Sequence, residues 1–89
     1  MEFEWDENKR AINLRVHGLD FTRATTLFDG RPMYTYLSPR GGEERSVSIA
    51  IEGEKFFAVI WTVRIQTTRI ISFRRARDAE ERKYRAVYG

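Results

Sequence analysis

The sequence predicts a single α+β domain, residues 1–89, in which helices pack on an antiparallel sheet of about four strands. Three observations support this fold class. Apolar residues recur at helical spacing in the first third of the chain, alternate with polar residues through the middle, and return to helical spacing near the C-terminus. A chain of 89 residues can bury one core, and separate runs of helix and strand are typical of the α+β class.

The N-terminal region is predicted to form a short strand and two helices. In residues 3–6, FEWD, two aromatic residues alternate with two acids, as in a short extended segment. Residues 7–16 contain good helix formers without glycine or proline. Asp6 can cap this helix, and Gly18 can end it in the left-handed conformation. A second helix is expected over residues 20–28, before the helix-breaking sequence DGRP.

The middle of the chain is predicted to form four strands. We expect them at 33–37, 44–51, 56–63 and 69–75, with turns at 38–42, 52–55 and 64–68. The third strand, FFAVIWTV, is apolar on both faces, which indicates a central strand covered on both sides. Strict alternation in the last strand predicts two faces, one with Arg69, Ile71, Phe73 and Arg75 and the other with Ile70, Ser72 and Arg74.

The C-terminal residues are predicted to form a final helix that ends near Tyr88. Asp78 followed by Glu81 resembles a capping box at its start. Tyr84 and Tyr88 would share one face, and Glu81 can pair with Arg85 one turn later.

The charge distribution favours a polyanionic partner. The chain has 16 basic and 13 acidic side chains, a net charge of +3. Residues 64–89 hold eight basic and three acidic side chains, a balance of +5, whereas residues 1–63 have a balance of −2. Positive charge gathered at one end is typical of proteins that bind nucleic acid or an acidic protein, although a solvated basic helix would look the same.

Several classes of protein are disfavoured by composition. The absence of cysteine excludes disulfides, thiolate nucleophiles and cysteine-ligated metals. One histidine with scattered carboxylates gives no metal-ligand spacing, so we expect neither a metal nor another cofactor. The apolar stretches are shorter than a membrane span, and the acidic start MEFEWDE lacks the basic region of a signal peptide, so we expect a cytoplasmic protein without membrane contact.

The remaining chemistry is that of basic side chains acting on a phosphate. RNA can be cut without a metal when the 2′-hydroxyl is positioned for in-line attack, a base and an acid are supplied, and guanidinium groups stabilise the transition state. Arginines on or beside consecutive strands can be brought together for this task, here Arg45, Arg64, Arg69 and Arg74. Each of them alone is equally explained as a charge that protects a sheet edge.

The first helix presents a second group of polar residues. Lys9, Asn13 and position 16 recur at i, i+4 and i+7, and His17 continues that face at the helix end. Histidine is the side chain best suited to proton transfer near neutral pH. Ordinary solvent exposure is the alternative interpretation.

Taken together, these residues resemble a known family. The segments FEWDENKRAINLRVHGLDFTRATTLFDG, GEERSVSIAI and RIISFRRARDAEERKY are similar, in order and over nearly the whole chain, to the BrnT toxins of type II toxin–antitoxin systems. The resemblance implies a RelE-like fold and a small ribonuclease that halts growth. The matching positions are Lys9, Asn13, His17, Gly18, Glu44, Arg45, Arg69, Ser72 and Arg74.

The resemblance also implies partners and site residues. The expected partners are RNA and a BrnA-like antitoxin with a ribbon-helix-helix fold, operator DNA contacted only through that antitoxin, and an oligomeric antitoxin complex. Candidate catalytic residues are Lys9, His17, Glu44, Arg64, Arg69 and Arg74, in which arginines hold the phosphate and His17, Lys9 or Glu44 transfers protons. Candidate RNA-binding residues are Arg45, Arg75 and Arg77.

Two positions depart from the family pattern. Val16 stands where the family usually has a lysine before His17, and Val63 stands where an acid usually precedes Arg64. Each replacement removes a charge near the expected site. The alternative function is therefore a catalytically weak toxin that acts as an antitoxin-bound co-repressor or as an RNA-binding module.

Overall fold

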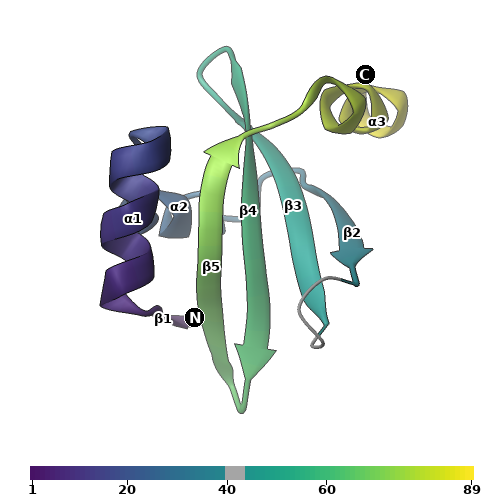
Figure 1. Cartoon of the computed structure of the whole chain (residues 1–89). Helices are drawn as coiled ribbons and strands as arrows, with labels where there is room; N and C mark the ends of the chain where they lie inside the picture. Colours follow the sequence, from purple (N-terminus) through teal and green to yellow (C-terminus); the bar gives the residue numbers. More distant parts are fainter. Residues whose placement is uncertain (40–43) are drawn as a thin grey trace.

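The structure is a computed structural model that describes residues 1–39 and 44–89. Five strands and three helices follow one another along the described chain (Figure 1). Their bounds are β1 Glu2–Glu4, α1 Glu7–His17, α2 Phe21–Thr25, β2 Tyr34–Ser38, β3 Arg45–Glu52, β4 Lys55–Arg64, β5 Thr67–Arg75 and α3 Asp78–Tyr88. The α+β class and the C-terminal helix are confirmed.

The sheet has one strand more than expected, and it is mixed. The strand order is β1-β5-β4-β3-β2, with antiparallel pairing throughout except that β1 runs parallel to β5. The predicted antiparallel sheet of about four strands is therefore wrong at this edge, because Glu2–Glu4 pairs with Thr67–Arg69. The prediction that β4 is central is confirmed. The turn expected at 38–42 extends into residues outside the described part of the chain.

The helix caps expected for α1 are present. The Asp6 carboxylate accepts hydrogen bonds from the backbone N–H groups of Asn8 at 2.8 Å and Lys9 at 3.3 Å. Gly18 ends the helix with a φ of 69°. This left-handed conformation is readily adopted by glycine, so the chain can leave the helix there without strain.

Helix α2 is shorter than predicted. It ends at Thr25 instead of Phe28. The hydroxyls of Thr25 and Thr26 donate to backbone carbonyls three residues earlier, each at 2.7 Å. Because the next backbone N–H groups also bond three residues back, the last turn tightens and the helix stops.

Two hydrophobic clusters cover the two faces of the sheet. The first joins α2 to the sheet through Phe21, Leu27, Phe57, Val59, Ile70 and Phe73. The second joins α3 to the opposite face through Val47, Ile49, Phe56, Ala58 and Tyr84. Alternate residues of β4 enter the two clusters, which explains why its sequence is apolar on both faces.

The predicted alternation fails in β5. Ile60 pairs with Ser72 but Trp61 pairs with Ile70, so a bulge leaves Ile71 without a partner opposite it. Ile70 and Phe73 therefore belong to the same cluster, although strict alternation would separate them. Ile71 and Ser72 both line a pocket with Val47 and Ile60, which belong to the cluster on the α3 side of the sheet.

The N-cap of helix α3 lies one residue earlier than predicted, and the helix itself begins at Asp78. Arg77, not Asp78, is the N-cap residue, and the carboxylate that reaches back to its backbone N–H is Glu80, at 2.8 Å, not Glu81. The expected contacts later in the helix are confirmed: Tyr84 and Tyr88 have ring centroids 4.9 Å apart, and Glu81 pairs with Arg85. Among the helices described, none is long and apolar enough to cross a membrane.

Beyond the short strand β1, the outer edge of β5 is closed by a side chain of α1. Asn13 is buried and forms a pair of hydrogen bonds with the backbone of Phe73, accepting from its N–H at 3.1 Å and donating to its carbonyl at 2.8 Å. Its amide also donates to the carbonyl of Leu19 at 2.9 Å. The Asn13 amide thus pairs with the backbone of Phe73 as a residue of a neighbouring strand would, and it satisfies backbone groups at the edge of β5.

Candidate functional site

Two grooves meet at the bulge of β5. The first, which we call the arginine groove, has a volume of about 340 Å³, and its walls include Tyr36, Ser38, Arg45, Ser72, Arg74 and Arg77. The second, the helix groove, lies against α1 and has a volume of about 220 Å³. Ile71 and Ser72 line both grooves, so the bulge that misaligns β5 also forms the boundary between them.

A buried ion pair organises one end of the arginine groove. Arg74 donates two parallel hydrogen bonds to the carboxylate of Glu80, at 2.8 Å and 3.0 Å, and Tyr36 donates its hydroxyl proton to the same group. The side chain of Glu80 is only 7% exposed and that of Arg74 only 15%. Arg74 is therefore fixed in place, and much of its charge is neutralised.

The protonation states of this network follow from the same contacts. Burial raises the pKa of Glu80, but hydrogen bonds from Arg74, the Arg77 backbone and Tyr36 outweigh it and hold this pKa at about 2. Burial and the neighbouring carboxylate raise the pKa of Tyr36. The pKa of Arg74 is raised by its hydrogen bonds to Glu80. At neutral pH Glu80 is therefore ionised and Tyr36 remains a hydrogen-bond donor.

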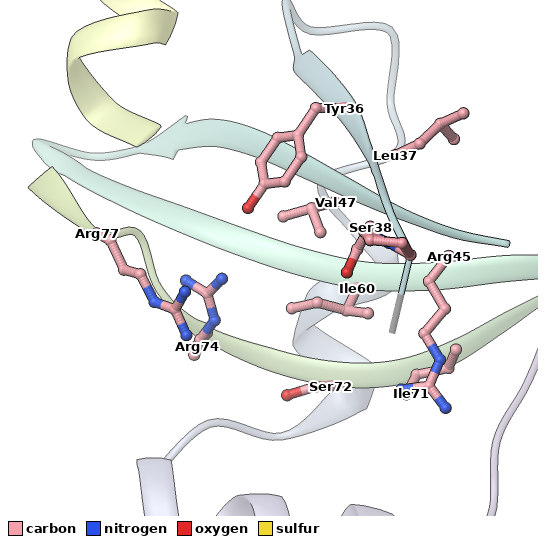
Figure 2. A pocket seen from close by; sticks show the side chains of 11 residues that line it. Tyr36, Leu37, Ser38, Arg45, Val47, Ile60, Ile71, Ser72, Arg74 and Arg77 are labelled. Carbon is pink, nitrogen blue, oxygen red and sulfur yellow. The ribbon is translucent and has the colours of Figure 1, made fainter. Parts of the chain in front are cut away.

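The other two arginines of the groove, Arg45 and Arg77, form no ion pair with a carboxylate among the described residues. Figure 2 shows Arg74 and Arg77 at one end of the groove and Arg45 at the other, with Ser72 between them. The Nε of Arg45 is buried and has no hydrogen-bond acceptor among the described residues. An anion in the groove would supply acceptors for the guanidinium groups that line it, since these groups match phosphate oxygens geometrically.

The helix groove contains the residues predicted on one face of α1. Lys9, Asn13, Val16 and His17 all line it. Asn13 has the structural role described above, and the Ser72 hydroxyl donates to its side-chain oxygen at 3.2 Å. Lys9 and His17 are exposed, and they are the groups at this groove that can move a proton.

Three of the predicted catalytic residues lie elsewhere. Arg64 and Arg69 sit near the β4–β5 turn, and Arg69 pairs with Glu4 of β1 at 2.7 Å. Arg74 lies five residues further along β5, roughly 15 Å away at the usual rise of a strand. Glu44 is exposed just before β3, where its backbone carbonyl accepts a bond from Thr62. Neither groove is lined by any of these three residues.

Arg75 faces the opposite side of the sheet from Arg74. Its guanidinium lies 5.4 Å from the centre of the Phe57 ring and donates to the carbonyl of Phe56. With His17, Arg23 and Lys55, it lines a third hollow of about 210 Å³, which we call the rear hollow. The arginine expected to bind RNA at this position is therefore separated from the arginine groove.

The sequence did not predict several polar residues of these sites as site residues, among them Tyr36, Glu80, Arg23 and Lys55. Tyr36 has a signal in the alternation of its strand, which places it with the buried face of β2. From the sequence, either Glu80 or Glu81 can be the carboxylate of the capping box. Glu80 takes this role because the N-cap residue is Arg77, three positions before it. Arg23 and Lys55 are separated in sequence and meet only through tertiary packing.

The arrangement suits the binding of a phosphodiester more than that of a metal ion. Within residues 1–39 and 44–89, no three histidine or carboxylate side chains gather as metal ligands would. Guanidinium groups at both ends of one groove can contact successive phosphates or stabilise charge that develops on one of them. A proton-transfer group from the helix groove would stand next to that phosphate, on the other side of Ser72.

Comparison with known proteins identifies the family. The sequence of residues 5–80 matches the model of the ribonuclease toxin BrnT of type II toxin–antitoxin systems. A comparison with curated protein sequences gave no significant match. The matched segment begins before α1 and ends at Glu80, so it includes β5 and the residues of the three hollows. The chain therefore belongs to the BrnT family of type II ribonuclease toxins.

Proposed function

We propose that the protein is a metal-independent endoribonuclease that cuts RNA in the arginine groove. One observation carries this proposal. Arg45, Arg74 and Arg77 come from β3, β5 and the start of α3, yet all three line one groove. Glu80 is the one carboxylate paired with them among the described residues, so positive charge remains for a phosphate.

Family membership provides the biological setting. A ribonuclease toxin of a type II system has RNA as its substrate and a protein antitoxin as its partner. We propose further that the antitoxin is a BrnA-like ribbon-helix-helix protein, that the two form an oligomer which contacts operator DNA only through the antitoxin, and that free toxin acts in the cytoplasm by cleaving RNA needed for translation.

The proposed reaction uses the 2′-hydroxyl of the RNA itself. The 2′ oxygen attacks the neighbouring phosphorus while the bond from phosphorus to the 5′ oxygen breaks, which gives a 2′,3′-cyclic phosphate and a free 5′-hydroxyl. His17 or Lys9, in its neutral form, accepts the proton of the 2′-hydroxyl, and the protonated form of either side chain donates a proton to the departing 5′ oxygen. Arg45 and Arg77 stabilise the charge on the phosphate oxygens, and the Glu80 pair holds Arg74 beside them. Arg64, Arg69 and Glu44 have no part in this site.

Cleavage of RNA by the purified chain in the presence of EDTA tests the proposal. We expect products with 2′,3′-cyclic phosphate ends and no cleavage where a 2′-deoxynucleotide occupies the scission site. The double variant His17→Ala, Arg77→Ala should lose at least about a hundredfold in rate, because a proton-transfer group and a phosphate contact are removed together. The matched control Arg15→Ala, Arg82→Ala removes two exposed cationic residues that line neither groove. Equal activity of the two double variants would refute this site.

A second candidate function is an antitoxin-bound co-repressor with weak or no nuclease activity. It is favoured by Val16, which is 65% exposed in the helix groove at the position where the family usually has a lysine. Val63, the other departure from the family pattern, is 59% exposed but lies beside Arg64, outside both grooves, so it has no bearing on cleavage at the proposed site. Induction in cells without the antitoxin separates the two functions, since only a nuclease arrests growth. Restoring the charge with Val16→Lys should then increase cleavage if the first function holds.

A further inference from the structure

The rear hollow lies on the side of the sheet away from the arginine groove, yet it is connected to it through shared residues. His17 lines both the rear hollow and the helix groove, and Ser72 lines both the helix groove and the arginine groove. The three hollows therefore lie one after another around the end of β5, in the order rear hollow, helix groove and arginine groove. Figure 1 shows the C-terminal end of α1, the end of β5 and the β3–β4 turn at this same end of the sheet.

The lining of the rear hollow is cationic. Arg23, Lys55 and Arg75 surround it together with the imidazole of His17 and the apolar residues Leu19 and Phe57. Arg23 is paired with Glu52. Lys55 and Arg75 form no ion pair with a carboxylate in the described part of the chain, so the hollow retains positive charge.

Arg75 is held in position without an ion pair, next to the paired Arg23. The guanidinium groups of Arg23 and Arg75 lie 5.0 Å and 5.4 Å from the centre of the buried Phe57 ring. Arg75 also donates from its Nε to the backbone carbonyl of Phe56 at 3.3 Å. An aromatic ring and a carbonyl orient a guanidinium while leaving its formal charge in place, which favours binding of an anion over a purely structural role.

We propose that the rear hollow binds a backbone phosphate of the same RNA strand that is cut in the arginine groove. This inference rests on the proposed function and adds a second contact to it, remote from the bond that breaks. A strand that passes from the arginine groove over Ser72 and His17 would reach Lys55 and Arg75 with a later phosphate. The rear hollow would then increase affinity for long RNA without contributing to the chemical step.

The test compares two charge reversals, Lys55→Glu and Arg15→Glu. Both residues are exposed, both variants change the net charge equally, and Arg15 lines none of the three hollows. Binding is measured with a long 2′-O-methyl RNA, which cannot be cleaved through its 2′ oxygen, and with a short one that cannot reach from the arginine groove to the rear hollow. Thermal unfolding of both variants verifies that they fold.

We expect Lys55→Glu to weaken binding of the long RNA by roughly tenfold at low salt. The slope of the logarithm of the binding constant against the logarithm of the salt concentration should become shallower by about 0.7, the value for one phosphate contact on a single strand. Binding of the short RNA should be unchanged, and Arg15→Glu should have a much smaller effect on both. Arg75→Gln removes one charge instead of reversing it, so it should weaken binding of the long RNA in the same way but by less. Equal effects of Lys55→Glu and Arg15→Glu, or equal effects of Lys55→Glu on long and short RNA, would overturn the proposal.

The same preparations distinguish failure of this inference from failure of the proposed function. Wild-type protein is incubated with unmodified long RNA in EDTA. If it does not cleave but its binding of 2′-O-methyl RNA still depends on Lys55, the rear hollow is supported and the nuclease proposal fails. If it cleaves and Lys55→Glu leaves the KM for long RNA unchanged, the rear hollow is refuted and the nuclease proposal remains. A raised KM with an unchanged kcat supports both.

Discussion

The two ends of strand β5 differ in what closes their outer edge and in what their arginines do. At the Thr67–Arg69 end, backbone pairing with β1 closes the edge, and Arg69 forms a partly exposed ion pair with Glu4. At the Ser72–Arg75 end, the side chain of Asn13 closes the edge, and Arg74 forms a buried ion pair on the wall of a groove. The bulge at Ile71 separates the two ends.

This difference shows how one strand can be both a structural element and part of a site. A neighbouring strand covers the edge completely and leaves no room for a ligand. A single amide covers it at one residue, so the space beside it remains open as the helix groove. Closure by the Asn13 side chain leaves the strand accessible, but the stability of that end then depends on a few buried polar contacts.

The substitution Asn13→Ala should have the largest effect on stability. It leaves the Phe73 N–H and the carbonyls of Phe73 and Leu19 without their partner, and each unsatisfied buried group costs about 1–3 kcal/mol. We expect the free energy of unfolding to fall by about 3–5 kcal/mol, measured by urea denaturation. Asn8→Ala, at an exposed position of the same helix, is the control. A loss below about 1 kcal/mol for Asn13→Ala would show that α1 does not close this edge.

The substitution Glu80→Gln should have the next largest effect, and the effect depends on pH. The folded-state pKa of Glu80, about 2, lies below its ordinary value of 4.5. Its ionisation therefore stabilises the fold fully above pH 4.5, and this stabilisation is lost as pH falls from 4.5 toward 2. The shift corresponds to about 3 kcal/mol. Asp20 and Asp29 also have lowered pKa values, so Glu80 accounts for only part of the stability that wild type loses over that interval, and the Glu80→Gln curve should be flatter by about this amount.

Glu4→Gln provides the matched variant at the other end of β5. The Arg69–Glu4 pair has side chains that are 26% and 40% exposed, so solvent screens it. We expect Glu4→Gln to change the free energy of unfolding at pH 7 by less than about 1 kcal/mol, as for other exposed pairs. If Glu4→Gln and Glu80→Gln were equally destabilising, burial would not be what distinguishes the two ends.

A small stabilising effect is expected at the β4–β5 turn. Ile65 adopts a φ of 54° there, an unfavourable conformation for a β-branched residue, and its side chain is 96% exposed. Asparagine tolerates this conformation, so Ile65→Asn should raise the free energy of unfolding by about 0.5–1 kcal/mol. Thermal unfolding measures the gain. An unchanged or lower melting temperature would mean that the turn carries no such strain.

Much of the fold could be predicted from local sequence patterns. The caps at Asp6 and Gly18, the two-sided burial of β4 and the tyrosine pair of α3 follow from rules that act over a few residues. The parallel pairing of β1 could not be predicted, because three residues carry no signal for the partner they choose. Nor could the bulge at Ile71, since alternation is the default and the exception is set by packing against α1 and α2.

The candidate site was less predictable than the fold for the same reason. In the sequence Arg69 and Arg74 are two arginines of one strand that both match the family pattern, and strict alternation places them on opposite faces. Their difference arises from their partners. Glu4, the partner of Arg69, is remote in sequence, and Glu80, the partner of Arg74, cannot be told from its neighbour Glu81. Asn13 was grouped with polar residues of a helix face, and its burial becomes evident only when β5 is placed beside that helix.

We propose that RNA is processed beside the Ser72–Arg75 end of β5 and not at the Thr67–Arg69 end. The most direct test is the initial rate of RNA cleavage in EDTA by Arg45→Ala and Arg69→Ala, both measured under conditions where each variant is folded. Arg45→Ala should lose about a hundredfold, because it removes a groove guanidinium, and Arg69→Ala should stay within about threefold of wild type. Loss of cleavage in Arg69→Ala with retention in Arg45→Ala would contradict the claim.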